Sequence, residues 1–295
     1  MADPLLPGLN VHEDTVLFRE ALNYTAARTG FIGRLIEKDY FCTVLLALLT
    51  AADPRLVFKG GTCLAKVHCG FFRLSEDLDF AISLPVTASR KERRRQVEAT
   101  KAAVASIPTA MPLFRSAAPL LGANDSAQYN GAFAYQSLLA GTDETIKVEI
   151  SLREPVLLKV DPCPTNTLLL DAINGEPMVP PIGIPCIAYA EAMAEKFRAA
   201  LTRREVAVRD FFDLDHAIQS LGLDPEAKSL INLVRQKVTI TDSEPVVVND
   251  ERLSQLRTQL ESRLRPVLRK ADFDQFKLDR AYVAVQRMAA RLGGE

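Results

Sequence analysis

The chain has 295 residues, of which 48% are hydrophobic and 25% charged, and its formal net charge at pH 7 is −1. This composition is typical of a globular protein with room for two domains, and it excludes bulk attraction to nucleic acid or to an anionic membrane. The five cysteines have no paired spacing, which argues against a disulfide framework. The start of the chain has no signal-peptide pattern, and its most apolar run, residues 41–52, is too short to span a bilayer. We therefore expect a cytoplasmic protein with no membrane partner.

The first eighty residues lead to a glycine turn at Gly60-Gly61. Apolar residues at helical spacing predict two helices before it, and a short apolar run predicts a strand that ends at the turn: residues 14–28, 33–49 and 55–58. Glycine permits a tight turn and close approach of a ligand to the backbone. We expect a small helix over residues 62–70 after the turn, with Thr62 at its N-cap and exposed N–H groups that attract phosphate.

An Asp-x-Asp sequence, Asp77 and Asp79, opens the next predicted strand, residues 78–84. If Leu78 and Phe80 pack inward, both aspartates point to the opposite face. Two adjacent carboxylates repel each other unless a cation lies between them. Mg²⁺ prefers a few carboxylate oxygens together with water and substrate phosphates. The pair therefore predicts a magnesium site.

The middle of the chain is predicted to hold one helix and several strands. The helix, residues 89–107, begins with RKERRR, for which a solvated helix face is the simpler interpretation and an RNA-phosphate contact the alternative. Residues 108–126 look irregular. Alternating apolar and polar residues then predict strands: residues 129–139, 144–152 and 156–160. Glu149 lies on the polar face of the second strand, so we expect it to be a third metal ligand beside Asp77 and Asp79.

A proline-rich stretch, residues 161–185, separates the strands from a helical C-terminal part. We predict an α+β fold: a domain with a mixed central sheet and N-terminal helices, residues 1–175, followed by an α-helical bundle domain, residues 176–295, that completes the active-site cleft. The helices expected in the second domain are residues 188–202, 204–221, 225–237, 250–267 and 272–292.

A glycine turn, a short helix and an Asp-x-Asp strand together form the ground plan of a nucleotidyltransferase. Attack on the α-phosphate of an NTP needs a metal held by clustered carboxylates, and the triphosphate needs N–H donors and cations. Seven residues around the turn are candidates for nucleotide binding: Lys59, Gly60, Gly61, Thr62, Lys66, Arg73 and Ser75. Two interpretations stay open for Arg73, a phosphate clamp or a cap of the strand end, and Ser75 could equally be a turn residue.

A second charged cluster lies between Ala194 and His216. Lys196 and Arg203 are seven residues apart and project from one helical face, and Asp210 and Asp213 follow at helical spacing. A helical lysine that reaches the triphosphate, with an aspartate that orients it, would complete the site. The spacing alone favours an ordinary pair of charged helices.

The sequence resembles a known toxin family in this stretch: FKGGTCLAKVHCGFFRLSEDLDF, residues 58–80. It is similar to the "KGGT-x-L-x-K … R-x-S-x-D-L-D-F" signature of the AbiEii/AbiGii-type toxins, nucleotidyltransferase-like proteins that include the MenT-like toxins. Upstream, IEKDYFC resembles the "EKDYW" helix of that family, with Phe41 where tryptophan is usual. The resemblance runs from about residue 30 to 215 and is looser in its later part.

The resemblance implies that the first domain is a polymerase β-like nucleotidyltransferase domain. It also implies a toxin of a toxin–antitoxin system that acts in abortive infection, an antiviral defence, with a cognate antitoxin encoded nearby. It implies that Asp77 and Asp79 hold Mg²⁺, and that Lys196 and Asp213 are the essential late residues of the family. Arg203 is expected to contact the nucleotide. The implied activity is Mg²⁺-dependent transfer of nucleotides from an NTP to RNA, at the 3′ acceptor end of a tRNA. Two alternatives stay open, namely transfer of a nucleotide to a protein hydroxyl and a non-catalytic nucleotide- or RNA-binding module.

Overall fold

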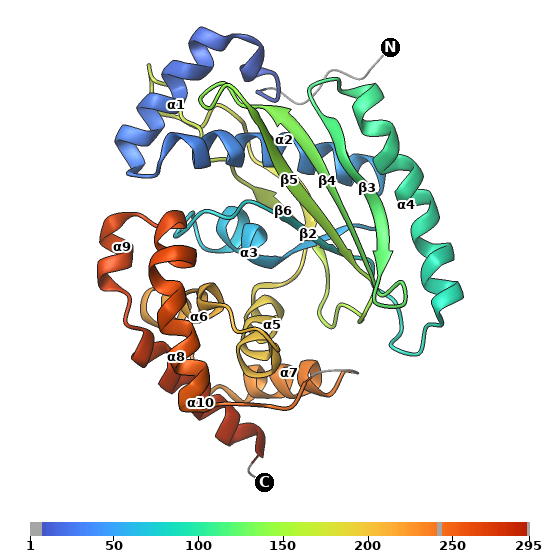
Figure 1. The fold of residues 1–295 in the computed structure, drawn as a ribbon, viewed down its shortest axis with the longest axis vertical. Helices are drawn as coiled ribbons and strands as arrows, with labels where there is room; N and C mark the ends of the chain where they lie inside the picture. Colours follow the sequence, from blue (N-terminus) through green and yellow to red (C-terminus); the bar gives the residue numbers. More distant parts are fainter. Residues whose placement is uncertain (1–7, 241–243, 294–295) are drawn as a thin grey trace. The chain divides into compact units, whose positions relative to one another are not determined.

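The computed structural model describes residues 8–240 and 244–293. The chain divides into two compact units, Met1–Ile187 and Ala188–Glu295 (Figure 1). The boundary predicted between residues 175 and 176 lies inside unit 1, because the last strand of the sheet, β7 (Ile182–Cys186), comes after it. Among the described residues, no helix combines the length and the apolar composition that crossing a membrane requires.

Unit 1 is built on one seven-stranded mixed sheet with strand order β3-β4-β5-β2-β1-β7-β6. Strand β2 occupies the centre, antiparallel to β1 and parallel to β5. The strands other than β7 are β1 (Val57–Lys59), β2 (Leu78–Ala81), β3 (Arg115–Ala123), β4 (Gln128–Gln136), β5 (Asp143–Ser151) and β6 (Asp161–Thr165). The mixed sheet in unit 1 and the helices that follow it confirm the predicted α+β class.

The helices of unit 1 surround this sheet: η1 (Val11–Glu13), α1 (Thr15–Thr29), α2 (Gly33–Ala52), α3 (Gly60–Cys63), the π-helical η2 (Leu64–His68) and α4 (Arg90–Ala110). Helix α2 is buried on all sides, with fourteen of its twenty residues inside the protein. Its Phe41 ring lies 4.2 Å from the ring of Tyr135 on β4, so α2 packs directly on the sheet. Helix α4 lies beside β3 (Figure 1).

Several predicted elements of unit 1 are wrong. Residues 108–126, expected to be irregular, contain the end of α4 and strand β3, whereas residues 156–160 form no strand. Strand β6 and most of β7 lie in the proline-rich stretch, for which no strand was predicted. β6 is an edge strand, where Pro162 and Pro164 are tolerated because one side of the strand needs no ladder hydrogen bonds.

Unit 2 is helical in all its described elements: α5 (Tyr189–Thr202), α6 (Val208–Ser220), α7 (Lys228–Thr239), α8 (Asp250–Gln259), η3 (Leu260–Leu264), η4 (Arg265–Val267), α9 (Lys270–Gln275) and α10 (Leu278–Gly293). Buried Arg252 of α8 donates to the carbonyl oxygens of Ala200, Leu201 and Arg203. These carbonyl groups at the C-terminal end of α5 have no acceptor role within the helix, so Arg252 supplies their hydrogen bonds. This contact fixes the loop that carries Arg203.

Candidate functional site

The glycine turn lies against the carboxylate of Asp79. Gly60 has φ of +76°, and a Cβ at this position would collide with Asp79 Oδ2. A side chain is therefore excluded both by the backbone conformation and by space. The helix begins at Gly60 with Lys59 at its N-cap, so the prediction that Thr62 is the N-cap is wrong.

Arg73 and Ser75 lie at the second glycine of the turn. A Cβ added to Gly61 would come 2.5 Å from Arg73 Nη2 and 3.2 Å from Ser75 Oγ. The Arg73 side chain is only 2% exposed, and its Nη1 donates to the carbonyl oxygen of Leu74. The structure thus brings both predicted residues to the turn, with the guanidinium buried beneath it and Ser75 half-buried.

Thr62 connects the turn to the Asp-x-Asp strand. Its side chain is buried, and its hydroxyl donates a 2.5 Å hydrogen bond to the backbone carbonyl of Asp77. On the other side of the same segment, the thiol of Cys42 lies 3.8 Å from the carbonyl oxygen of Glu76. Burial raises the pKa of Cys42 to about 12, so this thiol is neutral at physiological pH. Both contacts hold the backbone that carries Asp77.

The carboxylates of Asp79 and Glu149 occupy neighbouring strands at the same level. In the ladder between β2 and β5, Asp79 pairs with Glu149, and on its other side Asp79 pairs with Lys59 of β1. Leu78 and Phe80 are buried, so Asp79 points away from that core face, as the alternation predicts. Asp77 lies one residue before β2 and, like Asp79 and Glu149, is half-buried.

These carboxylates suit a hard cation that takes few protein ligands. Within the part of the chain that the structure describes, no three His, Cys, Asp or Glu side chains form a ready metal cluster. Mg²⁺ is commonly bound by one or two carboxylates, with waters and substrate phosphates completing its shell. Paired Asp79 and Glu149, with Asp77 two residues away from Asp79, match that donor set.

Lys66, a predicted nucleotide contact, is instead an internal structural residue. It is 1% exposed, and its Nζ lies 2.7 Å from Asp39 Oδ1 and 2.7 Å from Thr43 Oγ1. The same Nζ also donates to the carbonyl oxygens of Asp39 and Asn166. Its hydrogen-bonding capacity is therefore used inside the protein.

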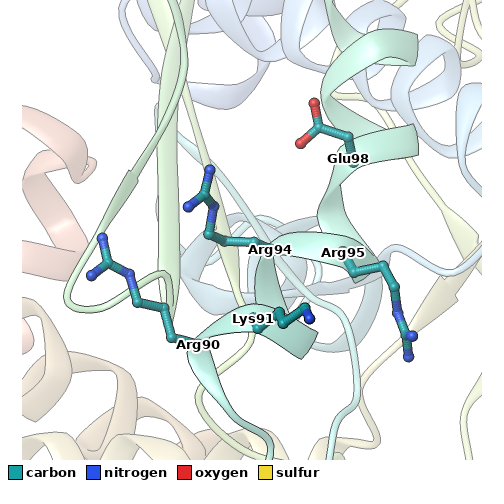
Figure 2. A pocket seen from close by; sticks show the side chains of 5 residues that line it. All are labelled: Arg90, Lys91, Arg94, Arg95 and Glu98. Carbon is teal, nitrogen blue, oxygen red and sulfur yellow. The ribbon is translucent and has the colours of Figure 1, made fainter.

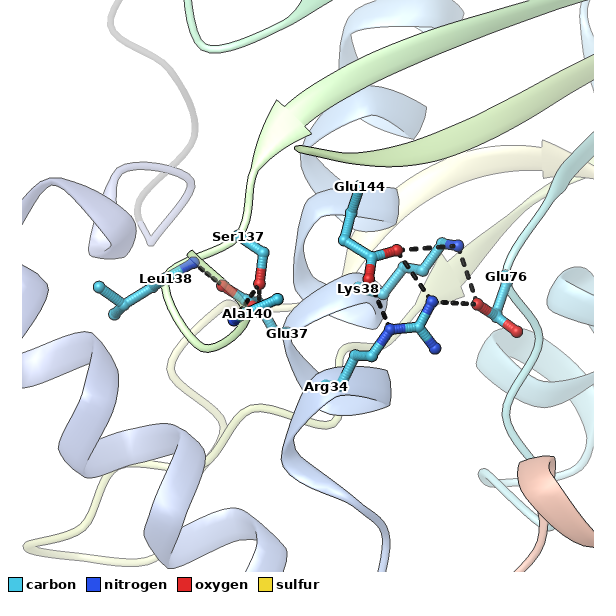
Figure 3. A network of polar contacts seen from close by, with 8 residues as sticks. All are labelled: Arg34, Glu37, Lys38, Glu76, Ser137, Leu138, Ala140 and Glu144. Atoms are coloured by element: carbon cyan, nitrogen blue, oxygen red, sulfur yellow. Dashed lines mark hydrogen bonds and ion pairs between the residues drawn. The ribbon is translucent and has the colours of Figure 1, made fainter. Parts of the chain in front are cut away.

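Helix α2 supports the Asp-x-Asp segment through a charged network (Figure 3). Lys38, 6% exposed, places its Nζ 2.8 Å from Glu76 Oε2, directly before Asp77. Arg34 binds Glu144 of β5 through two hydrogen bonds, of 2.6 and 2.9 Å. The hydrogen bond with Arg34 lowers the pKa of Glu144, so this carboxylate stays charged. The network therefore joins α2 to the strand that carries Glu149 and to the segment that carries Asp77.

The residues on either side of Lys38 fix two other segments. Glu37, fully buried, accepts hydrogen bonds from the hydroxyl of Ser137 (2.6 Å) and the backbone N–H of Leu138 (2.5 Å) (Figure 3). Asp39 binds Lys66 and also accepts a 3.0 Å hydrogen bond from the backbone N–H of Leu168. Sequence reasoning assigned no role to these residues, although three consecutive charges in an otherwise apolar helix were a visible signal.

In unit 2, the second charged cluster assembles around Lys196. Its Nζ lies 2.8 Å from Asp210 Oδ1 and 2.8 Å from Asp213 Oδ2, and its side chain is 13% exposed. Arg203, about half exposed, places Nη1 2.9 Å from the other oxygen of Asp210. Asp210 was not among the predicted site residues, yet it joins the two cations. The spacing i, i+3 from Asp213 was the available signal.

Two cationic neighbours, Lys196 and Arg203, favour the ionised form of Asp210. Burial, the strongest single influence, acts to raise the pKa of this carboxyl, but the charges of Lys196 and Arg203 outweigh it, and the pKa lies below its ordinary value. Lys196 therefore lies between two aspartates, of which Asp213 has a fully buried side chain. This arrangement holds a lysine in one position while leaving part of it exposed.

Comparison with known proteins finds one family and seven similar chains of solved structure, among them two from Helicobacter pylori. Residues 44–288 match the profile of the family described as "Nucleotidyl transferase AbiEii toxin, Type IV TA system". A Helicobacter pylori structure named as a candidate nucleotidyltransferase is 18% identical, with 84% of this chain and 90% of that chain covered and a TM-score of 0.46. JHP933 from Helicobacter pylori is 17% identical, with 84% and 88% covered and a TM-score of 0.47. No curated protein matches the chain.

Proposed function

The chain belongs to the AbiEii family of nucleotidyl transferase toxins of type IV toxin–antitoxin systems, and we propose that it transfers nucleotides from an NTP to the 3′ acceptor end of tRNA in a Mg²⁺-dependent reaction. The observation that carries the proposal is the fit of the glycine turn to Asp79, where a side chain on Gly60 would collide with the carboxylate. A phosphate-binding turn in contact with a metal-binding carboxylate is what transfer of a nucleotide requires.

The turn provides the contacts to the triphosphate. Gly60 and Gly61 leave the backbone open to phosphate oxygens, and Lys59 and Ser75, both half-buried, supply a cation and a hydroxyl. Arg73 and Thr62 are almost completely buried. We assign these two the role of holding the turn and the Asp77 backbone in place.

The carboxylates of Asp77, Asp79 and Glu149 would hold the Mg²⁺. When bound there, the ion would neutralise charge on the phosphates and promote ionisation of the attacking hydroxyl. In the reaction, the 3′ oxygen of the RNA forms a bond to the α-phosphorus of the NTP. The bond from that phosphorus to the bridging oxygen of the β-phosphate breaks, pyrophosphate leaves, and the hydroxyl proton passes to solvent.

Lys196 and Asp213 of unit 2 are proposed to be needed for the same reaction. Lys196 is held by two carboxylates and keeps part of its side chain accessible, as a lysine that binds a triphosphate must. Arg203 is more exposed and is proposed as a further nucleotide contact. In the cell the protein would act in the cytoplasm, where NTPs and tRNA are found, and a cognate antitoxin would oppose it.

Transfer of radioactive label tests this function directly. Wild-type protein with Mg²⁺ and each labelled NTP in turn should label tRNA in a total RNA preparation, and Asp79→Asn should reduce labelling by at least about a thousandfold. Asp143→Asn, an exposed carboxylate at the start of β5, is the matched control and should keep full activity. If label is found only on added proteins, the acceptor is a protein and not RNA.

Expression in growing cells separates an enzyme from a binding module. The wild type and Asp143→Asn should arrest growth, and Asp79→Asn should not. If Asp79→Asn, present at the wild-type level and with the wild-type circular dichroism spectrum, still arrests growth, then toxicity does not depend on nucleotide transfer.

A further inference from the structure

The first turns of α4 concentrate positive charge around a hollow in the surface. Arg90, Lys91, Arg94 and Arg95, with Glu98, line a cavity of about 650 Å³. Figure 2 shows Arg90 and Arg94 extending to one side of the helix, with Lys91 and Arg95 on the other. We call these four cations the α4 basic cluster. All four are exposed, although the whole chain carries a net charge of only −1.

This placement of charge opposes the stability of the helix. The N-terminal end of a helix carries partial positive charge, so that cations in its first turn are unfavourable. Arg90 and Arg94 are four residues apart, as are Lys91 and Arg95, and like charges at that spacing destabilise a helix. A sequence selected only for a solvated face would not repeat this pattern twice.

Little inside unit 1 neutralises the α4 basic cluster. Within the described part of the chain, Lys91, Arg94 and Arg95 make no hydrogen bond or ion pair. Arg90 lies 3.9 Å from Asp125, but both side chains are mostly exposed. Arg93 differs, because it donates to the carbonyl oxygens of Ala88 and Asp125 and so has a structural role.

The acidic residues of α4 form their hydrogen bonds and ion pairs outside the α4 basic cluster, although Glu98 lines the same hollow and Glu92 attracts Arg95 electrostatically. Glu92 forms the capping box, accepting from the backbone N–H of Ser89 at 2.7 Å and from its hydroxyl at 2.8 Å. Glu98 lies 3.4 Å from Lys101. The charge of the α4 basic cluster is therefore available to an external anion.

We propose that the α4 basic cluster binds the phosphate backbone of the acceptor RNA, an inference that rests on the proposed function. Three of its four cations are arginines, whose planar guanidinium groups bind phosphate through two hydrogen bonds. Arg90 and Arg94, like Lys91 and Arg95, are about one helical turn apart, so that neighbouring cations can contact successive phosphates of one strand. An acidic protein surface would offer separate carboxylates rather than a continuous row of phosphates.

The experiment compares RNA affinity in full-length Arg94→Gln/Arg95→Gln with that of the wild type, using fluorescently labelled tRNA over a range of salt concentrations. Affinity at low salt should fall on the order of tenfold, and the slope of log affinity against log salt should decrease by about 2. The thermal midpoint should stay constant or rise, because two like-charge pairs are removed. A merely destabilising substitution would lower it.

Arg115→Gln/Lys159→Gln is the matched control, since both residues are exposed cations of unit 1 with their own acidic partners, Asp143 and Asp161. It should bind tRNA like the wild type. Wild-type labelling of tRNA with unchanged affinity in Arg94→Gln/Arg95→Gln would overturn this inference and leave the proposed function intact. Failure of the wild type to bind or label any RNA would overturn the proposed acceptor itself. Polyglutamate, measured in the same way, stands in for an acidic protein. If Arg94→Gln/Arg95→Gln loses binding to polyglutamate and keeps its binding to RNA, the cluster binds an acidic protein instead.

Discussion

Two lysine–aspartate pairs, one in each unit, look alike in geometry and differ in accessibility. Lys66 Nζ lies 2.7 Å from Asp39 in unit 1, and Lys196 Nζ lies 2.8 Å from Asp213 in unit 2. The Lys66 side chain is fully buried, whereas that of Lys196 is 13% exposed. Both lysines were candidates for the nucleotide site on sequence grounds.

The difference separates a fully enclosed ion pair from one whose lysine is partly exposed. Around Lys66 the acceptors include a hydroxyl and two backbone carbonyls as well as a carboxylate, so no donor remains for a substrate. Lys196 forms ion pairs with two carboxylates, which set its position and favour its charged form. Burial and partner chemistry, rather than the distance between charges, therefore distinguish the two lysines, and the role proposed at the nucleotide is assigned to Lys196.

The largest effect on stability is expected at Lys66. Lys66→Met leaves the carboxylate of Asp39 buried without its cation, and removal of one partner of a buried pair costs about 3–5 kcal/mol. Urea denaturation should show this loss in the free energy of unfolding. Adding Asp39→Asn should recover part of it, because the buried charge is then absent. A loss below about 1 kcal/mol would contradict the structural role.

At Lys196 the largest change should appear in activity. Lys196→Met should lower the rate of nucleotide transfer about a hundredfold or more, the usual cost of removing one preorganised cation or donor from a transition state. Lys237, buried in the same unit beside Glu191, provides the control. Lys237→Met should lower the free energy of unfolding, but its kcat per folded molecule should stay close to that of the wild type. Equal kcat for Lys196→Met and wild type would remove Lys196 from the site.

A smaller effect is expected at Lys38, which supports the Asp-x-Asp segment. Lys38→Met releases Glu76 from α2, and we expect kcat to fall about tenfold with little change in the KM for NTP, because Asp77 loses its fixed position. Arg34→Met should have less effect, since Arg34 is 45% exposed and 3.7 Å from Glu76. Equal losses for the two variants would argue against a specific positioning role.

The smallest effect is a pH dependence in unit 2. The pKa of Asp210 lies below its ordinary value of 3.8, so its contribution to stability is complete above that pH and is lost as pH falls through the lower, folded-state pKa. The thermal midpoints of wild type and Asp210→Asn should therefore differ most near neutral pH and converge below pH 3.8. A constant difference down to the acid limit would mean that the carboxylate charge is not the cause.

Local patterns predicted the part of the site that lies on regular strands. The alternation in β2 and β5 placed Asp79 and Glu149 on polar faces, and the ladder sets them opposite each other. The two glycines marked a turn whose closeness to Asp79 only the structure shows. The burial of Lys66 was not visible, because its acceptors Thr43 and Asn166 come from distant parts of the chain.

The strands that were missed have weak local signals for two different reasons. Strand β3 is an edge strand with mostly exposed residues, so its hydrophobic pattern is weak. Strand β7 contains Pro185 and lies between β6 and β1, and its parallel partner β1 is more than a hundred residues earlier in the sequence. Local propensity is a poor guide where neighbouring strands supply the hydrogen bonds.

The charged residues of α2 also set an order of events during synthesis. Glu37 accepts a hydrogen bond from Leu138, 101 positions later in the sequence, and Asp39 accepts one from Leu168, 129 positions later. Contacts of such long range close slowly, since the chain must first lose the entropy of a large loop. A ribosome must therefore translate past residue 168 before Glu37 and Asp39 have all their hydrogen-bond donors, although Lys38 and Asp39 can form their ion pairs with Glu76 and Lys66 earlier. The buried carboxylates of α2 are fully bonded only when most of the first unit has left the exit tunnel.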